Sequence, residues 1–193
     1  MQLYLITHAH TQAQPSEDST VWQLSPTGRE QAMLLAQQPF WNQVEQIVLS
    51  AEAKTRLTIL PVLEQRGLPV YEDQRLNELH RVGWVTNEAY VEHVRQLFAN
   101  PTQSIASWEA ADAALQRVLT AVDYLCLHFA RKTVALVGHG LTLSLYRAYL
   151  LGNAHVDFKD WQQLSFAAVA LADPEQHQLL QDFAPVAGYA PRG

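Results

Sequence analysis

Two histidines stand at matching places in the sequence, each directly behind a short apolar run. His8 follows Gln2–Ile6 after one threonine, and His139 follows Thr133–Val137 after one glycine. A small residue comes after each histidine, and small residues let the backbone approach a ligand closely. Because ligands of open α/β sheets bind at the carboxyl ends of the strands, both imidazoles are expected at one edge of a sheet.

A third strand end supplies a positive charge. Ser50 follows the apolar run Gln46–Leu49, and Lys54 falls in the first turn of the helix expected next. A helix N-terminus favours an anion. Two imidazoles, one ammonium group and one helix end can therefore converge on a single anion. The alternative is that both histidines are structural residues held by hydrogen bonds, and spacing alone does not decide between the two.

Strands alternate with helices along the chain. The pattern predicts an α/β fold of three layers, with a mostly parallel sheet and helices on both faces. Thr27 and Glu30 have the spacing of a capping box, Ser50 is expected to cap the next helix, and Pro61 is expected to kink it. We expect strands at 2–6, 46–49, 69–72 and 133–137, helices at about 26–38, 51–66, 88–99, 107–130 and 141–151, and a hairpin of 166–172 with 177–183, followed by a loop from residue 184.

Length and composition exclude several classes of protein. The 193 residues are expected to form a single domain, 1–193, and one cysteine excludes an internal disulfide framework. The net charge of −6 and the lack of a Lys/Arg cluster argue against nucleic acid. No apolar run approaches the roughly 18 residues of a membrane span, and the N-terminus lacks signal-peptide features, so a cytoplasmic protein is expected. Nothing in the sequence specifies an oligomeric state.

Several motifs occur in the order that they have in a known superfamily. Together they resemble the histidine phosphatase, or phosphoglycerate mutase-like, superfamily over roughly residues 2–172. Thr7-His8-Ala9-His10-Thr11 is similar to the Arg-His-Gly-x-Thr signature of that superfamily, and Leu24–Ala32 is similar to its next segment. Ser50-Ala-Glu-Ala-Lys54-Thr-Arg-Leu-Thr58 resembles its Ser-x-x-x-Arg-x-x-x-Thr helix start, and Leu76-Asn-Glu78 resembles its Leu-x-Glu loop. Trp108-Glu109 with Arg117 resembles a later helix, and Gly138-His139-Gly140 resembles its second histidine motif.

The resemblance implies hydrolysis of a phosphomonoester through a phosphohistidine. His8 would be the nucleophile, with one ring nitrogen free and the proton of the other held by a carbonyl near Ala9. His139 would donate hydrogen bonds to the phosphoryl oxygens. Glu78 would protonate the leaving oxygen and then activate water. No cofactor or metal is implied, and the partner is a phosphorylated small molecule or phosphate.

The phosphate-binding set departs from the superfamily's pattern. Thr7 stands in place of the motif arginine, so this chain resembles a divergent member, and loss of one preorganised donor typically costs about 10²–10³ in rate. Lys54 would supply a point charge without the fork of an arginine. Thr7 and Thr11 are expected to hydrogen-bond phosphate. Arg81, three residues after Glu78, is the candidate to replace the missing arginine, with His80 as a competing donor.

Two other functions remain open. With Thr7 in place of arginine, the chain can be a catalytically degenerate protein of the same fold that binds a phospho-ligand or a partner. Thr7-His8-Ala9-His10 also resembles the start of the metallo-β-lactamase signature Thr-His-x-His-x-Asp-His, which would make His8 and His10 ligands of a metal-dependent hydrolase. Gln12 and Ala13 stand where that signature requires Asp and His.

Overall fold

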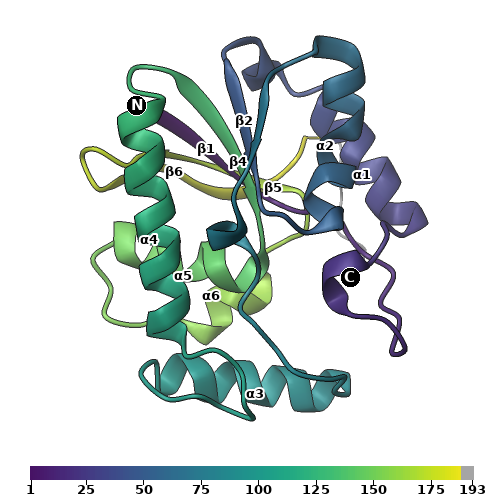
Figure 1. Cartoon of the computed structure of the whole chain (residues 1–193), viewed down its shortest axis with the longest axis vertical. Helices are drawn as coiled ribbons and strands as arrows, with labels where there is room; N and C mark the ends of the chain where they lie inside the picture. The colour runs from purple at the N-terminus through teal and green to yellow at the C-terminus, as the bar shows by residue number, and fades with distance from the viewer. Residues whose placement is uncertain (188–193) are drawn as a thin grey trace.

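One mixed sheet of six strands forms the middle of the molecule in the computed structural model, which describes residues 1–187 (Figure 1). Its strand order is β3-β2-β4-β1-β5-β6. Strands β1 to β4 are parallel to one another, and β5 and β6 add two antiparallel pairings at one side. The strands are β1 (Gln2–Thr7), β2 (Gln46–Leu49), β3 (Val70–Glu72), β4 (Thr133–Gly138), β5 (Ala168–Asp173) and β6 (Gln178–Pro185).

The pairing of β1 with β4 sets the place of both histidines. The two strands are adjacent and parallel, and their register aligns Thr7 with Gly138. His8 and His139 are therefore the next residues of two neighbouring strands at the same sheet edge. The amide of His8 also donates a hydrogen bond to the carbonyl of Gly138, at 2.9 Å. The expectation that both imidazoles lie at one edge of the sheet is confirmed by this strand pairing.

Helices cover both faces of the sheet, as predicted (Figure 1). Alternate residues of β1 face opposite layers: Leu3 and Leu5 pack in one core cluster with α4 and α5, and Tyr4 and Ile6 pack in another with α1 and α2. Burial on both faces explains why the strand is apolar throughout. The helices are α1 (Pro26–Ala36), α2 (Ala53–Arg66), α3 (Asn87–Ala99), α4 (Ala111–His128), α5 (Gly140–Leu150) and α6 (Phe158–Gln163).

The helix starts differ from the predicted caps. Ser25, not a box of Thr27 and Glu30, caps α1, because its side chain accepts the amide of Gly28. The N-cap of α2 is Glu52, not Ser50, and it makes no side-chain cap bond. Ser50 is instead engaged by a histidine, as described below. Pro61 lies inside α2.

Some elements have no counterpart among the predictions. Helix α6 and three short 3₁₀ helices, Ser19–Val21, Pro39–Asn42 and Gln74–Leu76, lie outside the predicted helices and strands. Strand β6 continues to Pro185, where a loop was expected from residue 184. Within the described part of the chain, no helix is long and apolar enough to cross a membrane.

Candidate active site

The rings of His8 and His139 face each other beyond the ends of β1 and β4. Their centroids are 5.3 Å apart, and the ring planes are inclined by 60°. Nδ1 of His8 lies 2.8 Å from the carbonyl oxygen of Ala9. A carbonyl only accepts, so Nδ1 carries the ring proton and Nε2 keeps its lone pair. This is the tautomer that a nucleophilic imidazole requires.

His8 is held in its neutral form. Burial lowers the pKa of His8 to about 3, because the charged imidazolium loses its solvation, and the nearby Lys54 ammonium adds repulsion. The hydrogen bond to the Ala9 carbonyl opposes this shift without cancelling it. At neutral pH the ring is therefore uncharged and able to attack an electrophile.

His139 is buried and has one nitrogen without a partner. Its Nε2 lies 2.7 Å from Oγ of Ser50, and its Nδ1 has no hydrogen-bond partner among the described residues. Ser50 Oγ accepts the amide of Glu52 at 3.3 Å and also lies 3.2 Å from Oγ1 of Thr55. With the Ser50 hydrogen directed to Nε2 of His139, the ring proton lies on Nδ1, which can then donate to a ligand. Burial lowers the pKa of His139 too, with Lys54 and His8 adding to the effect. An unpartnered buried donor beside His8 suits an oxyanion ligand.

Glu78 lies at the N-terminus of α5. Its Oε1 accepts the amides of Leu79 at 2.9 Å and Thr142 at 3.2 Å, and its Oε2 accepts the amide of Leu141 at 3.1 Å. These bonds fix the carboxyl group and leave Oε2 a second lone pair for a proton. Burial raises the pKa of Glu78 above its ordinary value, although the bonds from Leu141 and Leu79 oppose the rise. A carboxyl group with a raised pKa can act as an acid nearer neutral pH.

Lys54 is paired with a carboxylate that the sequence analysis did not single out. Its Nζ lies 2.5 Å from Oε2 of Glu52, and both side chains are buried. The other oxygen of Glu52 accepts the amide of Glu78 at 2.6 Å and lies 3.6 Å from Nε2 of His139. Glu52 therefore touches three of the expected site residues. The sequence signal for this ion pair is a carboxylate two residues before Lys54, at the start of the same helix.

Arg81 lines the cavity that contains His8. Its guanidinium carbon lies 5.0 Å from the ring centroid of Tyr90 and 5.6 Å from that of Trp108. Contact of a guanidinium with two aromatic rings limits its freedom and favours its charged form at this place. The structure thus brings Arg81 together with His8, Lys54 and Glu78 in the lining of one cavity.

Thr7 is buried and bonded within the fold. Its hydroxyl donates to the carbonyl of Ser165 at 2.9 Å and accepts the amide of Ala168 at 2.9 Å. The only hydrogen of the hydroxyl is used, so in this arrangement Thr7 can meet a ligand only as an acceptor. Its contacts tie the start of β5 to the end of β1.

Replacement of Thr7 by valine tests this structural role. The substitution keeps the shape of the side chain and removes the hydroxyl, so the Ser165 carbonyl and the Ala168 amide lose their partner. We expect the free energy of unfolding in urea to fall by about 1–3 kcal/mol. Replacement of the exposed Thr102 by valine is the control for loss of a threonine hydroxyl at the surface. An unchanged denaturation midpoint for Thr7→Val would contradict the assignment.

The remaining candidate residues, His10, Thr11 and His80, differ in whether they line a cavity around His8. Thr11 and His10 line the same cavity as His8, and the backbone of Thr11 bridges to Leu24. Nδ1 of His10 lies 2.8 Å from Oγ of Ser25. The side chain of His80 is exposed and lines neither cavity around His8, so the geometry favours Arg81 over His80 as a cation near the ring.

Arg117 holds the loop that carries Glu78. Its guanidinium donates to the carbonyls of Arg75 and Asn77, each at 2.7 Å, and to that of Glu78 at 3.0 Å. It also forms an ion pair with Glu109 at 2.8 Å. The carbonyls of this loop would otherwise be partly unsatisfied, so Arg117 acts as a positioning residue for Glu78.

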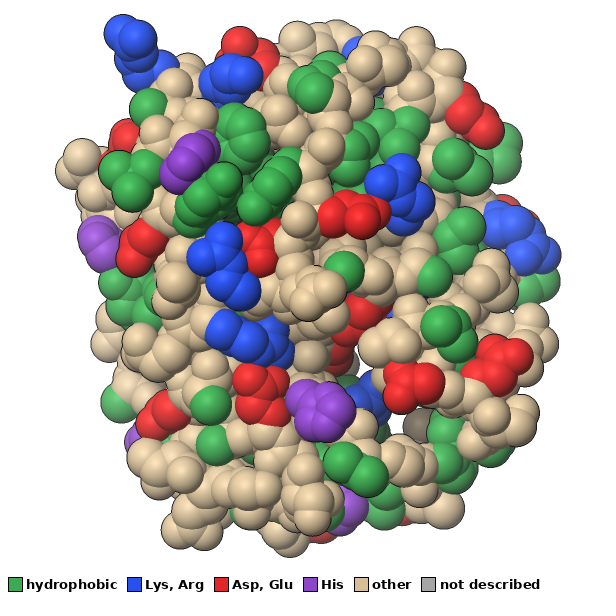
Figure 2. All heavy atoms as spheres, in the orientation of Figure 1, with side chains coloured by type: hydrophobic (Ala, Val, Ile, Leu, Met, Phe, Trp, Pro, Cys, Tyr) green, Lys and Arg blue, Asp and Glu red, His purple; other side chains and the backbone are tan. Residues whose placement is uncertain are grey.

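Two adjoining cavities meet at His8 and Glu78. The larger has a volume of about 600 Å³ and the smaller about 340 Å³. The larger contains the cations Lys54 and Arg81, and the smaller lies beside Thr7. Figure 2 shows the surface hollowed between α3 and the N-terminal loop, with acidic, basic and histidine side chains around the hollow.

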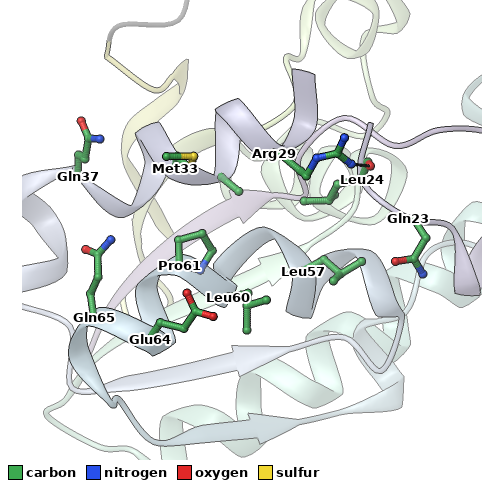
Figure 3. A pocket seen from close by; sticks show the side chains of 11 residues that line it. Gln23, Leu24, Arg29, Met33, Gln37, Leu57, Leu60, Pro61, Glu64 and Gln65 are labelled. Carbon is green, nitrogen blue, oxygen red and sulfur yellow. Dashed lines mark hydrogen bonds between the residues drawn. The ribbon is translucent and has the colours of Figure 1, made fainter. Parts of the chain in front are cut away.

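A separate groove lies between α1 and α2. It has a volume of about 480 Å³ and shares no lining residue with the two cavities around His8. Figure 3 shows Met33 of α1 opposite Leu60 and Pro61 of α2, with polar side chains at its ends. Among the residues of 1–187 that line it there is no histidine and a single basic residue, Arg29, whose guanidinium donates to the carbonyl of Leu24 at 2.9 Å. The groove therefore lacks the groups on which the chemistry above depends.

His8 and His10 lie two positions apart in the sequence, a spacing that allows two ligands of one metal ion. In residues 1–187 no group of three or more His, Cys, Asp or Glu side chains is arranged to hold a metal ion. Nδ1 of each ring is engaged, that of His8 by the Ala9 carbonyl and that of His10 by Ser25.

Comparison with known proteins assigns the architecture. The family model of the histidine phosphatase superfamily (branch 1) matches residues 3–182. Bacillus stearothermophilus YhfR superposes with a TM-score of 0.80 at 21% identity, over 97% of this chain and 98% of that one. A mycobacterial glucosyl-3-phosphoglycerate phosphatase gives a TM-score of 0.75 at 22% identity, over 97% and 99%. A putative alpha-ribazole-5'-P phosphatase from Escherichia coli gives 0.73 at 22%, over 98% and 100%.

At these identities the solved structures support the fold alone. No curated protein sequence matches the chain. The family model covers most of the chain, including both histidines, Lys54 and Glu78.

Proposed function

Because the chain belongs to the histidine phosphatase superfamily, branch 1, we propose that it hydrolyses phosphomonoesters through a phosphohistidine on His8. The observation that carries the proposal is the pair of imidazoles: His8 is neutral with Nε2 free, and the Nδ1 of the buried His139 beside it has no partner within the described part of the chain. One supplies a nucleophile and the other a donor for the oxygens of the group that is attacked.

In the first step, Nε2 of His8 attacks phosphorus and the bond from phosphorus to the leaving oxygen breaks. Nδ1–H of His139 donates to a phosphoryl oxygen, where negative charge is concentrated in the transition state. Glu78 gives its proton to the leaving oxygen, which departs as an alcohol. Its raised pKa favours the protonated form that this role requires.

In the second step, the Glu78 carboxylate takes a proton from water while the water oxygen attacks phosphorus. The bond between phosphorus and Nε2 breaks, inorganic phosphate leaves, and His8 returns to its neutral form. The three backbone amides around Glu78 keep the carboxyl group in one place through both steps. The same group therefore acts first as an acid and then as a base.

Lys54 and Arg81 supply the positive charge that a protein of net charge −6 needs in its phosphate site. Glu52 partly neutralises Lys54. Of the cations Lys54 and Arg81, Lys54 is paired with a carboxylate, whereas Arg81 lies against the aromatic rings of Tyr90 and Trp108. We assign Arg81 the part that the motif arginine would have at Thr7.

Replacement of Arg81 by alanine is expected to lower kcat/KM for p-nitrophenyl phosphate at least about tenfold, because a preorganised cationic donor is lost. Arg81→Lys keeps the charge without the fork and should recover only part of the loss. Arg56→Ala is the matched control, since Arg56 forms an exposed ion pair with Glu72. A loss no larger for Arg81→Ala than for Arg56→Ala would return Arg81 to a purely structural role.

The covalent intermediate gives the direct test of the proposal. The protein is mixed with p-nitrophenyl phosphate, quenched in alkali, and digested for mass spectrometry. We expect phosphate on the peptide that contains His8, stable in alkali and lost in acid. Turnover without any phosphate on His8 would contradict the mechanism.

A second function, binding of a phospho-ligand without turnover, is favoured by one observation. The buried pair of Glu52 and Lys54 places a carboxylate beside the proposed phosphate position, and Thr7 offers no cation there. If this function holds, inorganic phosphate binds in titration calorimetry, whereas p-nitrophenyl phosphate is turned over no faster than by a His8→Ala variant.

A further inference from the structure

The larger cavity at His8 has two chemically different parts. Its catalytic part contains His8, Glu78 and the cations Lys54 and Arg81. The rest of its lining includes four aromatic side chains, which we call the aromatic wall: Trp22, Trp84, Tyr90 and Phe166. A volume of about 600 Å³ exceeds what a phosphoryl group fills, so the space along the aromatic wall is left for the leaving alcohol.

The aromatic wall is continuous with the catalytic part. The ring centroid of Phe166 lies 5.5 Å from that of His8, and Tyr90 lies under the guanidinium of Arg81. Burial raises the pKa of Tyr90, so its phenol stays neutral. An alcohol attached to a phosphoryl group at His8 would therefore contact uncharged rings directly.

The outer part of the aromatic wall is open to solvent. The ring centroids of Trp22 and Trp84 are 6.0 Å apart, and Trp22 is fixed by a bond of 3.3 Å from Nε1 to the carbonyl of Glu17. Trp84 is 49% exposed, and Phe166, at the inner end beside His8, is still 41% exposed. Large exposed rings at the mouth of a cavity are typical of ligand-binding surfaces.

Carboxylates lie in the same lining. Glu17 and Asp18 belong to the loop that precedes Trp22 and both line the cavity. Hydrogen bonds from Thr20 lower the pKa of Asp18, which keeps this carboxyl group charged. A second anionic group on the substrate would be repelled at this end of the cavity.

We propose that the substrate is a phosphomonoester whose leaving alcohol carries a flat aromatic ring and no second anionic group. The inference rests on the proposed function for the place of the phosphoryl group. The ring of the alcohol packs against the aromatic wall, with Trp84 as its outermost contact. Offset or edge-to-face packing of such rings favours this class of alcohol over small acyclic ones.

Alkyl phosphates that differ only in a ring give the test, because their leaving oxygens have similar basicity. We expect kcat/KM for 3-phenylpropyl phosphate to exceed that for propyl phosphate at least about tenfold, and 3-phosphoglycerate to be poorer than propyl phosphate. Trp84→Ala should reduce the ratio of the first two to about threefold or less. Val82→Ala is the control, because Val82 is exposed in the same loop and does not line the cavity.

Three outcomes would overturn the inference: a ratio near one for the unmodified protein, a ratio that Trp84→Ala leaves unchanged, or a preference for 3-phosphoglycerate. If neither alkyl phosphate is turned over in a His8-dependent way, the proposed function fails separately. Titration calorimetry with the same two phosphates then measures the ratio of their dissociation constants. A ratio of at least about tenfold that Trp84→Ala reduces supports the aromatic wall, and equal affinities refute it.

Discussion

Replacement of His8 by alanine is expected to lower kcat/KM for p-nitrophenyl phosphate at least about a thousandfold, because it removes the nitrogen that forms the covalent intermediate. The effect should fall on kcat, since Lys54, Arg81 and His139 remain to bind the phosphoryl group. The measurement is initial rate against substrate concentration, together with the dissociation constant of inorganic phosphate.

The control for this prediction is His155→Ala, which removes an exposed histidine that lines neither cavity around His8. Its kinetic constants should match those of the unmodified protein. A His8→Ala variant that keeps more than about a tenth of the original kcat would show that a group other than this imidazole performs the chemistry.

The central strands were predictable because their sequence signal depends on local burial. Strand β2 was predicted without error, and β1 and β4 within one residue, since strands covered on both faces are continuously apolar between polar residues. The meeting of His8 and His139 at one sheet edge followed from the rule for parallel strands. The rule places the two histidines close together because β1 and β4 are neighbours in the sheet.

The finer arrangement of the site depends on contacts between distant segments, which periodicity does not encode. The hydroxyl of Thr7 is used by residues 165 and 168, about 160 positions away in the chain. The pairing of Glu52 with Lys54 was hidden because a carboxylate at the start of a helix ordinarily faces solvent. The contact of Arg81 with Tyr90 and Trp108 joins three separate segments of the chain, two of which were expected as the helices 88–99 and 107–130. Nothing in the period of either helix indicates that its aromatic residue meets Arg81.

Replacement of Glu78 by glutamine is expected to lower kcat for propyl phosphate by about 10²–10⁴, because the amide can neither protonate the leaving oxygen nor activate water. The loss in the first step should be smaller for p-nitrophenyl phosphate, whose leaving oxygen needs no proton. A burst of nitrophenol followed by slow turnover would then show the phosphoenzyme accumulating. The measurement is stopped-flow absorbance for one substrate and phosphate release for the other.

The pH profile separates Glu78 from the ionisation of the substrate. In the unmodified protein, the acid form of Glu78 is required, and its pKa is raised, so kcat/KM for propyl phosphate should fall as pH rises through that raised value. His8 limits activity only on the acid side, near its pKa of about 3. In the Glu78→Gln variant, the decrease of kcat/KM at alkaline pH that depends on the ionisation of Glu78 should disappear. The change in kcat/KM that is set by the second ionisation of the phosphomonoester, near about pH 6, should remain. Superimposable profiles for the two proteins would mean that Glu78 is not the acid, and that its bonds to the start of α5 serve the fold alone.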